Sequence, residues 1–207
     1  MTHHRRRNNG TDPSKINETV ELSPAQRYAA FKQTQAKQRT VAAEFARSMP
    51  FELDEFQMQA NDALEAGDNV LVAAPTGAGK TVAADFAIYL AQTRNVKAFY
   101  TTPIKALSNQ KYHDLVDQYG TDKVGLLTGD TSINSEADIV VMTTEVLRNM
   151  LYEHSVTLEA LRYVILDEVH YLADRFRGPV WEEVIIHLPK NVNIIGLSAT
   201  VSNVEDF

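Results

Sequence analysis

The sequence predicts an α/β protein in which helices cover both faces of a doubly wound, mainly parallel β-sheet. Short apolar runs recur along the chain, and stretches of helical composition separate each run from the next. The runs are mostly apolar and rich in β-branched residues, which is typical of strands buried on both faces. A glycine-bearing turn follows the first run, and an acidic pair ends a later one. This alternation favours right-handed crossovers, with a site at the carboxyl ends of the strands.

The composition limits the size and class of the protein. The 207 residues, 44% of them hydrophobic, can build one such domain with an extension, whereas two full domains would not fit. The absence of cysteine excludes a disulfide framework and a thiolate metal site. No run approaches the roughly 20 apolar residues of a membrane span, and no apolar stretch follows Arg5–Arg7 to make a signal peptide. We therefore expect a cytoplasmic protein without a membrane partner.

The formal net charge of −7 bears on nucleic-acid binding. It argues against a surface coated for non-specific binding, because such affinity depends on counterions displaced from phosphates. A narrow site is still compatible with this charge, since backbone amides, helix N-termini and hydroxyls also hold phosphates.

The chain divides by composition into three parts. Residues 1–22 are polar, and we expect a disordered tail there. Residues 23–48 are expected to form a long helical extension that Ser23 caps and that has Pro24 in its first turn. Residues 49–207 are expected to form the α/β domain.

A further helix is expected just before the glycine turn. Asp54 can cap a helix that runs toward Ala66, and Gly67 can end it. Near its start, Phe51 could stack on an adenine base and the amide of Gln57 could hydrogen-bond to it, since an amide both donates and accepts. Packing in the core explains the same two residues equally well.

The remaining elements alternate in order. The expected strands are Val70–Ala74, Ala98–Thr102, Val124–Leu127, Ile139–Thr143, Tyr163–Leu166 and Asn193–Leu197. The expected helices between them are Thr81–Gln92, Ile104–Gln118, Glu145–Leu151 and Pro179–Leu188. Trp181 lies in the last of these helices and is interpreted as a core residue.

The glycine turn has the composition of a phosphate cradle. Its residues are Ala74, Pro75, Thr76, Gly77, Ala78, Gly79, Lys80 and Thr81. The first amides of a helix favour an anion, and glycines let the backbone close around it without Cβ clashes. Lys80 would neutralise the outer phosphates, and Thr81 would place its hydroxyl on a bridging Mg²⁺ ion. The predicted ligand is a nucleoside triphosphate with its metal.

The acidic pair Asp167 and Glu168 ends the run Tyr163–Leu166, where a parallel sheet would bring it beside the cradle. Asp167 would hold Mg²⁺ directly or through water, and Glu168 would orient and deprotonate the water that attacks the γ-phosphate. Paired acids at a strand end also serve as helix caps, but the cradle upstream favours the catalytic interpretation.

Together these motifs resemble a known family. The cradle, Asp167–His170 and Ser198–Thr200 resemble motifs I, II and III of the superfamily 2 DExH-box helicases, with Ala74 at the position where the usual cradle pattern has glycine. Thr101–Lys111, Leu127–Asp130, Thr143–Arg148 and Arg177–Glu183 resemble the superkiller-type, exosome-associated RNA helicases, and within that group the chain is most similar to the actinobacterial HelY helicases. The resemblance covers the chain from about Phe51 to its end.

The resemblance implies a RecA-like P-loop NTPase domain that uses ATP and Mg²⁺ and binds single-stranded RNA, with the RNA-degradation machinery as a further partner. It assigns Phe51 and Gln57 to adenine, and His170, Ser198, Ala199 and Thr200 to coupling between the sites. The residues that fall where the family grips one nucleic-acid strand are Thr102, Pro103, Lys105, Ser108, Asn109, Gln110, Thr128, Gly129, Asp130, Thr143, Thr144, Glu145 and Arg148. Polar turns after parallel strands can line one groove, although ordinary polar strand ends and helix starts have the same composition.

The family resemblance also implies what lies beyond this chain. Ser202–Glu205 has the pattern of a capping box close to the end of the sequence, so the chain is expected to be truncated. Family members continue into a second RecA-like domain that supplies arginines to the transition state, and loss of such an arginine lowers the rate by about 10³ to 10⁵. The isolated chain is therefore expected to be a monomer that is nearly inactive as an ATP hydrolase.

Three functions fit these observations. The first is the motor domain of an ATP-dependent RNA helicase that translocates on single-stranded RNA and unwinds duplexes. An ATP-dependent DNA helicase of the repair type shares motifs I to III and is the nearest alternative. A module that binds ATP or RNA without turnover is the third, and Glu168 argues against it for the parent protein.

Overall fold

The computed structural model describes Ser23, Ala25, Tyr28, Lys32 and residues 39–175 and 178–199. The chain forms two units, residues 1–39 and residues 40–207. The second unit contains the sheet and every helix and strand discussed below. Among the described residues, no helix is both long enough and apolar enough to span a membrane.

The second unit is built on a seven-stranded sheet with the order β1-β7-β6-β2-β5-β3-β4. Its strands are β1 (Val70–Ala73), β2 (Lys97–Thr102), β3 (Val124–Thr128), β4 (Thr131–Ile133), β5 (Ile139–Thr143), β6 (Leu161–Asp167) and β7 (Asn193–Ser198). All neighbouring strands are parallel except β3 and β4, which form an antiparallel hairpin. The predicted doubly wound, mainly parallel sheet is therefore confirmed.

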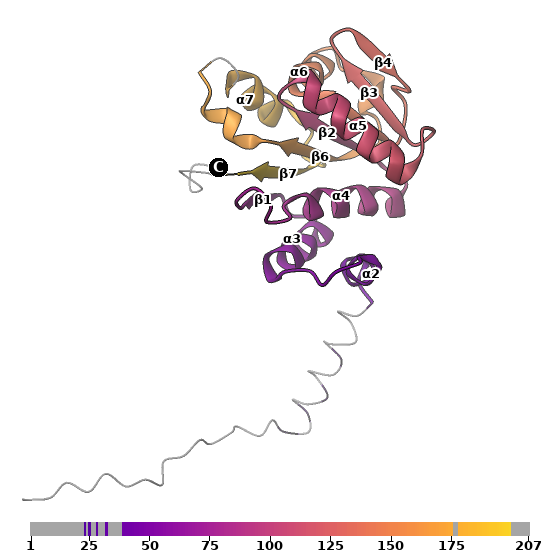
Figure 1. Ribbon diagram of the computed structural model, residues 1–207, viewed down its shortest axis with the longest axis vertical. Coiled ribbons are helices and arrows are strands. Elements are labelled where there is room, and N and C mark those ends of the chain that lie inside the picture. Colours follow the sequence, from indigo (N-terminus) through magenta and orange to yellow (C-terminus); the bar gives the residue numbers. More distant parts are fainter. Residues whose placement is uncertain are drawn as a thin grey trace, which may run out of the picture. The chain divides into compact units, whose positions relative to one another are not determined.

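Helices cover both faces of this sheet (Figure 1). They are α2 (Val41–Ser48), α3 (Glu55–Ala66), α4 (Thr81–Arg94), α5 (Lys105–Tyr119), α6 (Thr144–Tyr152) and α7 (Gly178–His187), with short 3₁₀ helices η1 (Val156–Leu158) and η2 (Val169–Ala173). Successive strand residues point to opposite faces. In β2, for example, Tyr100 packs in the core with α2 to α5, whereas Phe99 packs in the core with α6 and α7. Trp181 is buried in this second core, as predicted.

The predicted strands are all present, with ends that differ by at most two residues. Strand β4 was not predicted, because its three residues are polar or half-exposed and carry no apolar pattern. Thr128 pairs with Thr131, so Gly129 and Asp130 form the two-residue turn of the hairpin. Such a turn was the available signal for the extra strand.

The single helix predicted from Ser23 to Ser48 is wrong at Thr40. Thr40 has an extended backbone, with φ −76° and ψ 155°, and its hydroxyl accepts a hydrogen bond from the amide of Ala43 as the N-cap of α2. A threonine side chain competes for backbone donors in this way and favours a cap over a helix interior. Helix α2 is therefore a separate element that starts at Val41. The predicted tail, residues 1–22, lies outside the described residues.

Helix α2 is fastened to α3 by a carboxylate. Glu65 accepts hydrogen bonds from the amides of Val41, at 2.9 Å, and Ala42, at 2.7 Å. These amides belong to the first turn of α2, where the backbone has no intrahelical acceptor and a negative charge is favoured. Phe45 then buries its ring against Phe86 of α4, with ring centroids 5.2 Å apart.

Helix α3 begins and ends where the sequence predicts. Asp54 and Gln57 form a capping box at its start, and Gly67 ends it in a left-handed conformation with φ +97°. Strand β1 begins four residues after the end of α3, so the end of the helix helps to fix the position of β1 and of the loop that follows it.

Replacing Gly67 by alanine should destabilise the protein by about 1 to 3 kcal/mol, because the left-handed backbone is strained for a residue that has a Cβ atom. A Cβ at this position would meet nothing within 4 Å, so backbone strain alone is tested. Urea unfolding would measure the change. Gly129→Ala is the matched control, because Gly129 has open space around it and no positive φ. A Gly67→Ala effect as small as that of the control would contradict the strain argument.

Candidate functional site

The strand order gathers the predicted nucleotide residues on three adjacent strands. Strands β1, β7 and β6 are neighbours, and their carboxyl ends are level, since Ala73 pairs with Ser198 and Leu197 pairs with Asp167. The cradle, Ser198 and Asp167 therefore leave the sheet side by side. We call this part of the edge the nucleotide half.

The predicted nucleic-acid residues follow the next three strands. Strands β2, β5 and β3 are neighbours, and Thr102 at the end of β2 pairs with Thr143 at the end of β5. Thr128 ends β3 beside them. We call this part of the edge the nucleic-acid half, and it meets the nucleotide half where β6 lies beside β2.

The loop between β1 and α4 has the backbone of an anion cradle. Gly77 and Gly79 have φ values of +86° and +75°, which glycine adopts readily. A Cβ built on Gly77 would meet nothing within 4 Å, so the loop is open at that residue. Ala78 donates its amide to the carbonyl of Pro75 at 3.2 Å, which closes the turn, while Thr76 is exposed.

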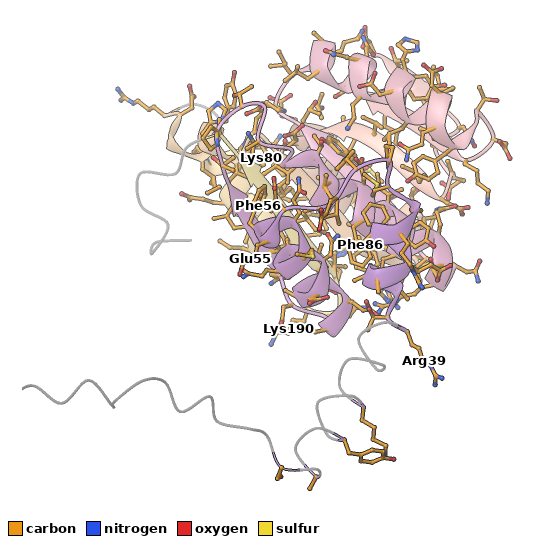
Figure 2. The ribbon with its side chains drawn as sticks, turned by 60° about the horizontal axis from the view of Figure 1, so that its bottom comes forward. Arg39, Glu55, Phe56, Lys80, Phe86 and Lys190 are labelled. Atoms are coloured by element: carbon orange, nitrogen blue, oxygen red, sulfur yellow. The ribbon has the colours of Figure 1, made fainter. Side chains whose placement is uncertain are left out.

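Lys80 and Thr81 stand at the N-terminus of α4, at the end of this loop. The Lys80 ammonium donates to the carbonyl of Pro75 at 3.0 Å and so lies over the cradle (Figure 2). Thr81 is the first residue of α4 and is exposed. The helix N-terminus and the lysine together favour an anion at this place.

Gln57 joins helix α3 to the cradle. Its Oε1 accepts from the amide of Asp54 at 2.8 Å, and its Nε2 donates to the carbonyl of Gly79 at 3.0 Å. The side chain is buried, with 4% of its surface exposed. The amide has one further lone pair and one further N–H, which the predicted contact with an adenine base would use. Phe51 is half-exposed and so has a ring face available for stacking.

Asp167 and Glu168 occupy the end of β6. Asp167 accepts two hydrogen bonds, from the amide of Glu168 to Oδ1 at 2.9 Å and from the hydroxyl of Tyr100 to Oδ2 at 2.7 Å. Glu168 has a left-handed backbone, with φ +60°, which is unusual for a residue with a side chain and recurs at functional sites. Its Oε2 lies 3.1 Å from Nδ1 of His170.

Tyr100 was missed by the sequence analysis. It is fully buried, and burial raises the pKa of its hydroxyl well above the usual range, with a further rise from the charge of Asp167. The hydroxyl therefore stays protonated and remains a donor. A tyrosine within an apolar strand gave no local signal, because the partner comes from a strand 67 residues away.

Of the predicted coupling residues, Ser198 ends β7, the strand between β1, which leads into the cradle, and β6, which carries the acids. The carbonyl of Ser198 accepts the amide of Ala74 at 3.1 Å, so the end of β7 is hydrogen-bonded to the start of the cradle. Ser198 is fully buried, and Ala199 follows it half-buried. Thr200 lies outside the described residues, as does Arg177 of the Arg177–Glu183 stretch.

In the nucleic-acid half, the first turn is the one between β2 and α5, and some of its side chains are buried while others are exposed. Thr102 and Ser108 are buried, with their hydroxyl oxygens 2.7 Å apart, and Pro103 is buried beside them. These residues shape the turn and do not present side chains to a ligand here. Lys105 and Gln110 are exposed, and Asn109 is half-buried.

The second turn supplies an acidic partner for Lys105. The ammonium of Lys105 lies 2.6 Å from both carboxylate oxygens of Asp130, and Thr128 donates its hydroxyl to the same carboxylate at 3.1 Å. The hydrogen bond from Lys105 is the largest of the causes that lower the pKa of Asp130. Gly129 is exposed between Thr128 and Asp130.

The third turn opens helix α6. Thr144 is buried and donates its hydroxyl to the carbonyl of Thr102 at 3.3 Å, and Thr143 is buried beside it. Glu145 is exposed, while Arg148 is half-buried, with its Nε 3.7 Å from a carboxylate oxygen of Glu183 on α7. The three predicted turns thus lie together, and their predicted polar side chains that are exposed or half-buried are Lys105, Asn109, Gln110, Asp130, Glu145 and Arg148.

The donor set of the nucleotide half fits Mg²⁺. The hydroxyl of Thr81 and the carboxylate of Asp167 are oxygen ligands, which this ion prefers, and Mg²⁺ usually takes one or two carboxylates together with phosphates. The described residues hold no cluster of three or more His, Cys, Asp or Glu that could bind a metal by themselves. A site completed by phosphate oxygens agrees with both observations.

Comparison with known proteins decides the family. The DEAD/DEAH box helicase family matches residues 54–207. This chain belongs to the DEAD/DEAH box helicases. Members of the family are ATP-dependent helicases of nucleic acids, and the α/β sheet described above is the helicase domain.

The relatives of this helicase domain include the groups that the motifs resemble. The chain is 63% identical to "Probable helicase HelY" of Mycobacterium tuberculosis over 79% of its length and 18% of the relative. It is 55% identical to "Superkiller complex protein 2" of Homo sapiens over 76% of its length and 12% of the relative. It is 52% identical to "DExH-box ATP-dependent RNA helicase DExH11" of Arabidopsis thaliana over 79% of its length and 12% of the relative. The helicase domain thus spans less than a fifth of these relatives.

A solved structure shares the fold. The "Structure of Mycobacterium smegmatis helicase Lhr bound to ssDNA and AMP-PNP" matches with a TM-score of 0.61 and 31% identity, over 78% of this chain and 24% of that one. The RecA-like helicase fold expected from the resemblance is confirmed.

Lys80→Ala should weaken nucleotide binding by this chain at least tenfold, because it removes the positive charge over the cradle. Calorimetry with ATP and MgCl₂ would measure the affinity. Lys190→Ala is the control, since Lys190 is an exposed lysine that lies far from Lys80 in Figure 2. Equal affinities for the two variants would refute the assignment of the cradle.

Proposed function

We propose that this chain is the ATP-binding motor domain of an ATP-dependent RNA helicase, which translocates on single-stranded RNA and unwinds duplexes by ATP hydrolysis. The observation that carries the proposal is that the loops after β1, β7 and β6 and the turns after β2, β5 and β3 lie on one edge of the sheet, as two neighbouring groups. Ligands of parallel α/β sheets bind at this edge. A nucleotide and a nucleic acid bound side by side at this edge would be adjacent where β6 pairs with β2.

In the nucleotide half, the residues of the chain would divide the work. The cradle from Ala74 to Gly79 would hold the phosphates with its amides, and Lys80 would place positive charge on the outer phosphates. Thr81 and Asp167 would hold Mg²⁺ through oxygen atoms, directly or through water. Bound Mg²⁺ neutralises charge on the phosphates during their transfer. Phe51 and Gln57 would contact the adenine.

Glu168 would act as the general base of hydrolysis. Its carboxylate would orient the attacking water and accept its proton. The neighbouring His170, 3.1 Å from this carboxylate, would hold the carboxylate in its orientation. Because His170 belongs to η2, a change in the position of the carboxylate would also be transmitted to η2. Ser198 would couple the cradle to the acids, because its strand lies between β1 and β6.

In the nucleic-acid half, exposed and buried residues would have different roles. Lys105, Asn109, Gln110 and Arg148 would contact the sugar-phosphate backbone with their side chains, and Gly129 with its amide. Thr102, Pro103, Ser108, Thr128, Thr143 and Thr144 would set the shape of the turns that present those groups. Asp130 would hold Lys105 ready until a phosphate takes its place, and Glu145 would flank the third turn.

RNA is favoured as substrate by the relatives. One relative carries RNA helicase in its name, and another is named as a component of the superkiller complex. These names support RNA as the nucleic acid and a protein complex as a partner of the whole protein. The motif resemblance is the ground for proposing single-stranded RNA, the RNA-degradation machinery and the cytoplasm as its setting. Activity of the isolated chain is expected to be low, because a second RecA-like domain would supply the transition-state arginines.

A DNA helicase is the second candidate, and one observation favours it. The structural neighbour at 31% identity was solved with single-stranded DNA and an ATP analogue. Backbone contacts to phosphate do not distinguish DNA from RNA, whereas contacts to the 2′-hydroxyl do.

ATPase measurements on the longest natural chain that contains this segment would separate the candidates. Stimulation by single-stranded RNA, with little by DNA of the same sequence, is the result we expect. Glu168→Gln should lower the stimulated rate at least a hundredfold while nucleotide binding persists, because the base is lost but the cradle remains. Stimulation by DNA that equals or exceeds that by RNA would favour the DNA helicase. Absence of turnover with either would favour a binding module.

A further inference from the structure

One side chain bridges the two halves of the sheet edge. Strand β6 ends the nucleotide half, and its neighbour β2 begins the nucleic-acid half. From β2, the hydroxyl of Tyr100 donates to Oδ2 of Asp167 on β6 at 2.7 Å. Tyr100 is fully buried, so packing holds its ring and the hydroxyl keeps a constant direction.

This hydrogen bond helps to orient the carboxylate of Asp167. The amide of Glu168 holds one oxygen, at 2.9 Å, and Tyr100 holds the other. Each carboxylate oxygen has a second lone pair, and these remaining lone pairs are what a metal ion or its bound water can use. Donors that orient a metal-binding carboxylate in this way tune the affinity of the site.

The ring of Tyr100 is in turn in contact with helix α5. The ammonium of Lys111, on α5, lies 4.8 Å from the centroid of the ring, within the range of a cation–π interaction. Asp85 of α4 lies near Lys111: burial raises the pKa of Asp85, and the charge of Lys111 opposes that rise. Lys111 follows Asn109 and Gln110 on α5, so the helix that presents polar groups to the nucleic-acid half also places a charge over Tyr100.

We propose that Tyr100 is a positioning residue for the carboxylate of Asp167 at the Mg²⁺ site, and that Lys111 links this hydrogen bond to helix α5. The proposal rests on the proposed function, because it requires Asp167 to hold the metal. A shift of α5 on binding a nucleic acid would change the position of Lys111 relative to the ring of Tyr100, and through the Tyr100 hydroxyl it would change the orientation of the Asp167 carboxylate.

The test is the Mg²⁺ dependence of nucleotide binding by this chain. The fluorescence of mant-ADP would be followed as MgCl₂ is added, for the unmodified chain and for Tyr100→Phe. We expect Tyr100→Phe to raise the Mg²⁺ concentration at half-maximal binding about tenfold, since loss of a hydrogen bond to a metal ligand has an effect of this order. Affinity for mant-ADP in EDTA should not change. An unchanged Mg²⁺ midpoint would overturn the proposal.

Two further variants make this result specific. Tyr163→Phe is the matched control, because Tyr163 is buried on the same face of the sheet but its hydroxyl bonds to Arg94 and not to the site. It should leave the Mg²⁺ midpoint unchanged, and an equal shift in both tyrosine variants would refute positioning by Tyr100. Asp167→Asn should raise the midpoint at least as much as Tyr100→Phe. If Asp167→Asn has no effect, the metal site of the proposed function fails; if only Tyr100→Phe has none, the further inference alone fails.

A double-mutant cycle tests the link to α5. Lys111→Met removes the charge but keeps the length of the side chain, and it should raise the Mg²⁺ midpoint by less than Tyr100→Phe does. In the Tyr100→Phe background it should add little, because its effect passes through the hydroxyl that is already lost. Independent, multiplicative shifts would show that Lys111 does not act through Tyr100 and would overturn the link.

Discussion

The backbone hydrogen bonds between parallel strands determine where each functional loop leaves the sheet. Ala73 is level with Ser198, and Leu197 is level with Asp167, so the cradle lies close to the acids. In the sequence, 86 residues lie between Lys80 and Asp167. The same pairing aligns Thr102 with Thr143. A register shift of one residue would turn these side chains to the opposite face. The whole site therefore depends on the pairing of the buried strands.

Such a sheet can carry polar groups in its interior only if they are paired. The hydroxyl of Tyr100 meets the carboxylate of Asp167, that of Thr101 meets the carbonyl of Ile165 at 3.0 Å, and that of Thr102 meets Ser108. An unpaired hydroxyl or carboxylate at these positions would lose hydration without replacement. The contacts of Tyr100 and Thr101 also join β2 to β6, so these two hydrogen bonds stabilise the sheet and connect the two candidate binding regions.

Electrostatics at the edge agrees with a net charge of −7. The exposed ammonium of Lys105 is neutralised by Asp130, and exposed ion pairs of this kind contribute little to stability. A phosphate group can therefore replace the carboxylate without disturbing the fold. In the proposed function, the cradle would bind phosphates largely through backbone amides and a helix N-terminus, which do not alter the formal charge. A chain with a negative net charge can in this way bind phosphates at a small local site.

The sequence by itself determined most helices and strands of this protein and the motifs that identify its family. Apolar runs, the cap at Asp54, the end at Gly67 and the glycines of the cradle act through the residues next to them, so a local pattern identifies them. Tertiary structure decided the rest: the order of the strands, the hairpin at Gly129 and Asp130, the burial of Thr102 and Ser108, and the bond between Tyr100 and Asp167. The same holds for the start of α2, since Glu65 of another helix stabilises its first turn. The strand order, the bond between Tyr100 and Asp167 and the contact of Glu65 with α2 join residues that are distant in the chain, and their energies exist only once these elements have packed together.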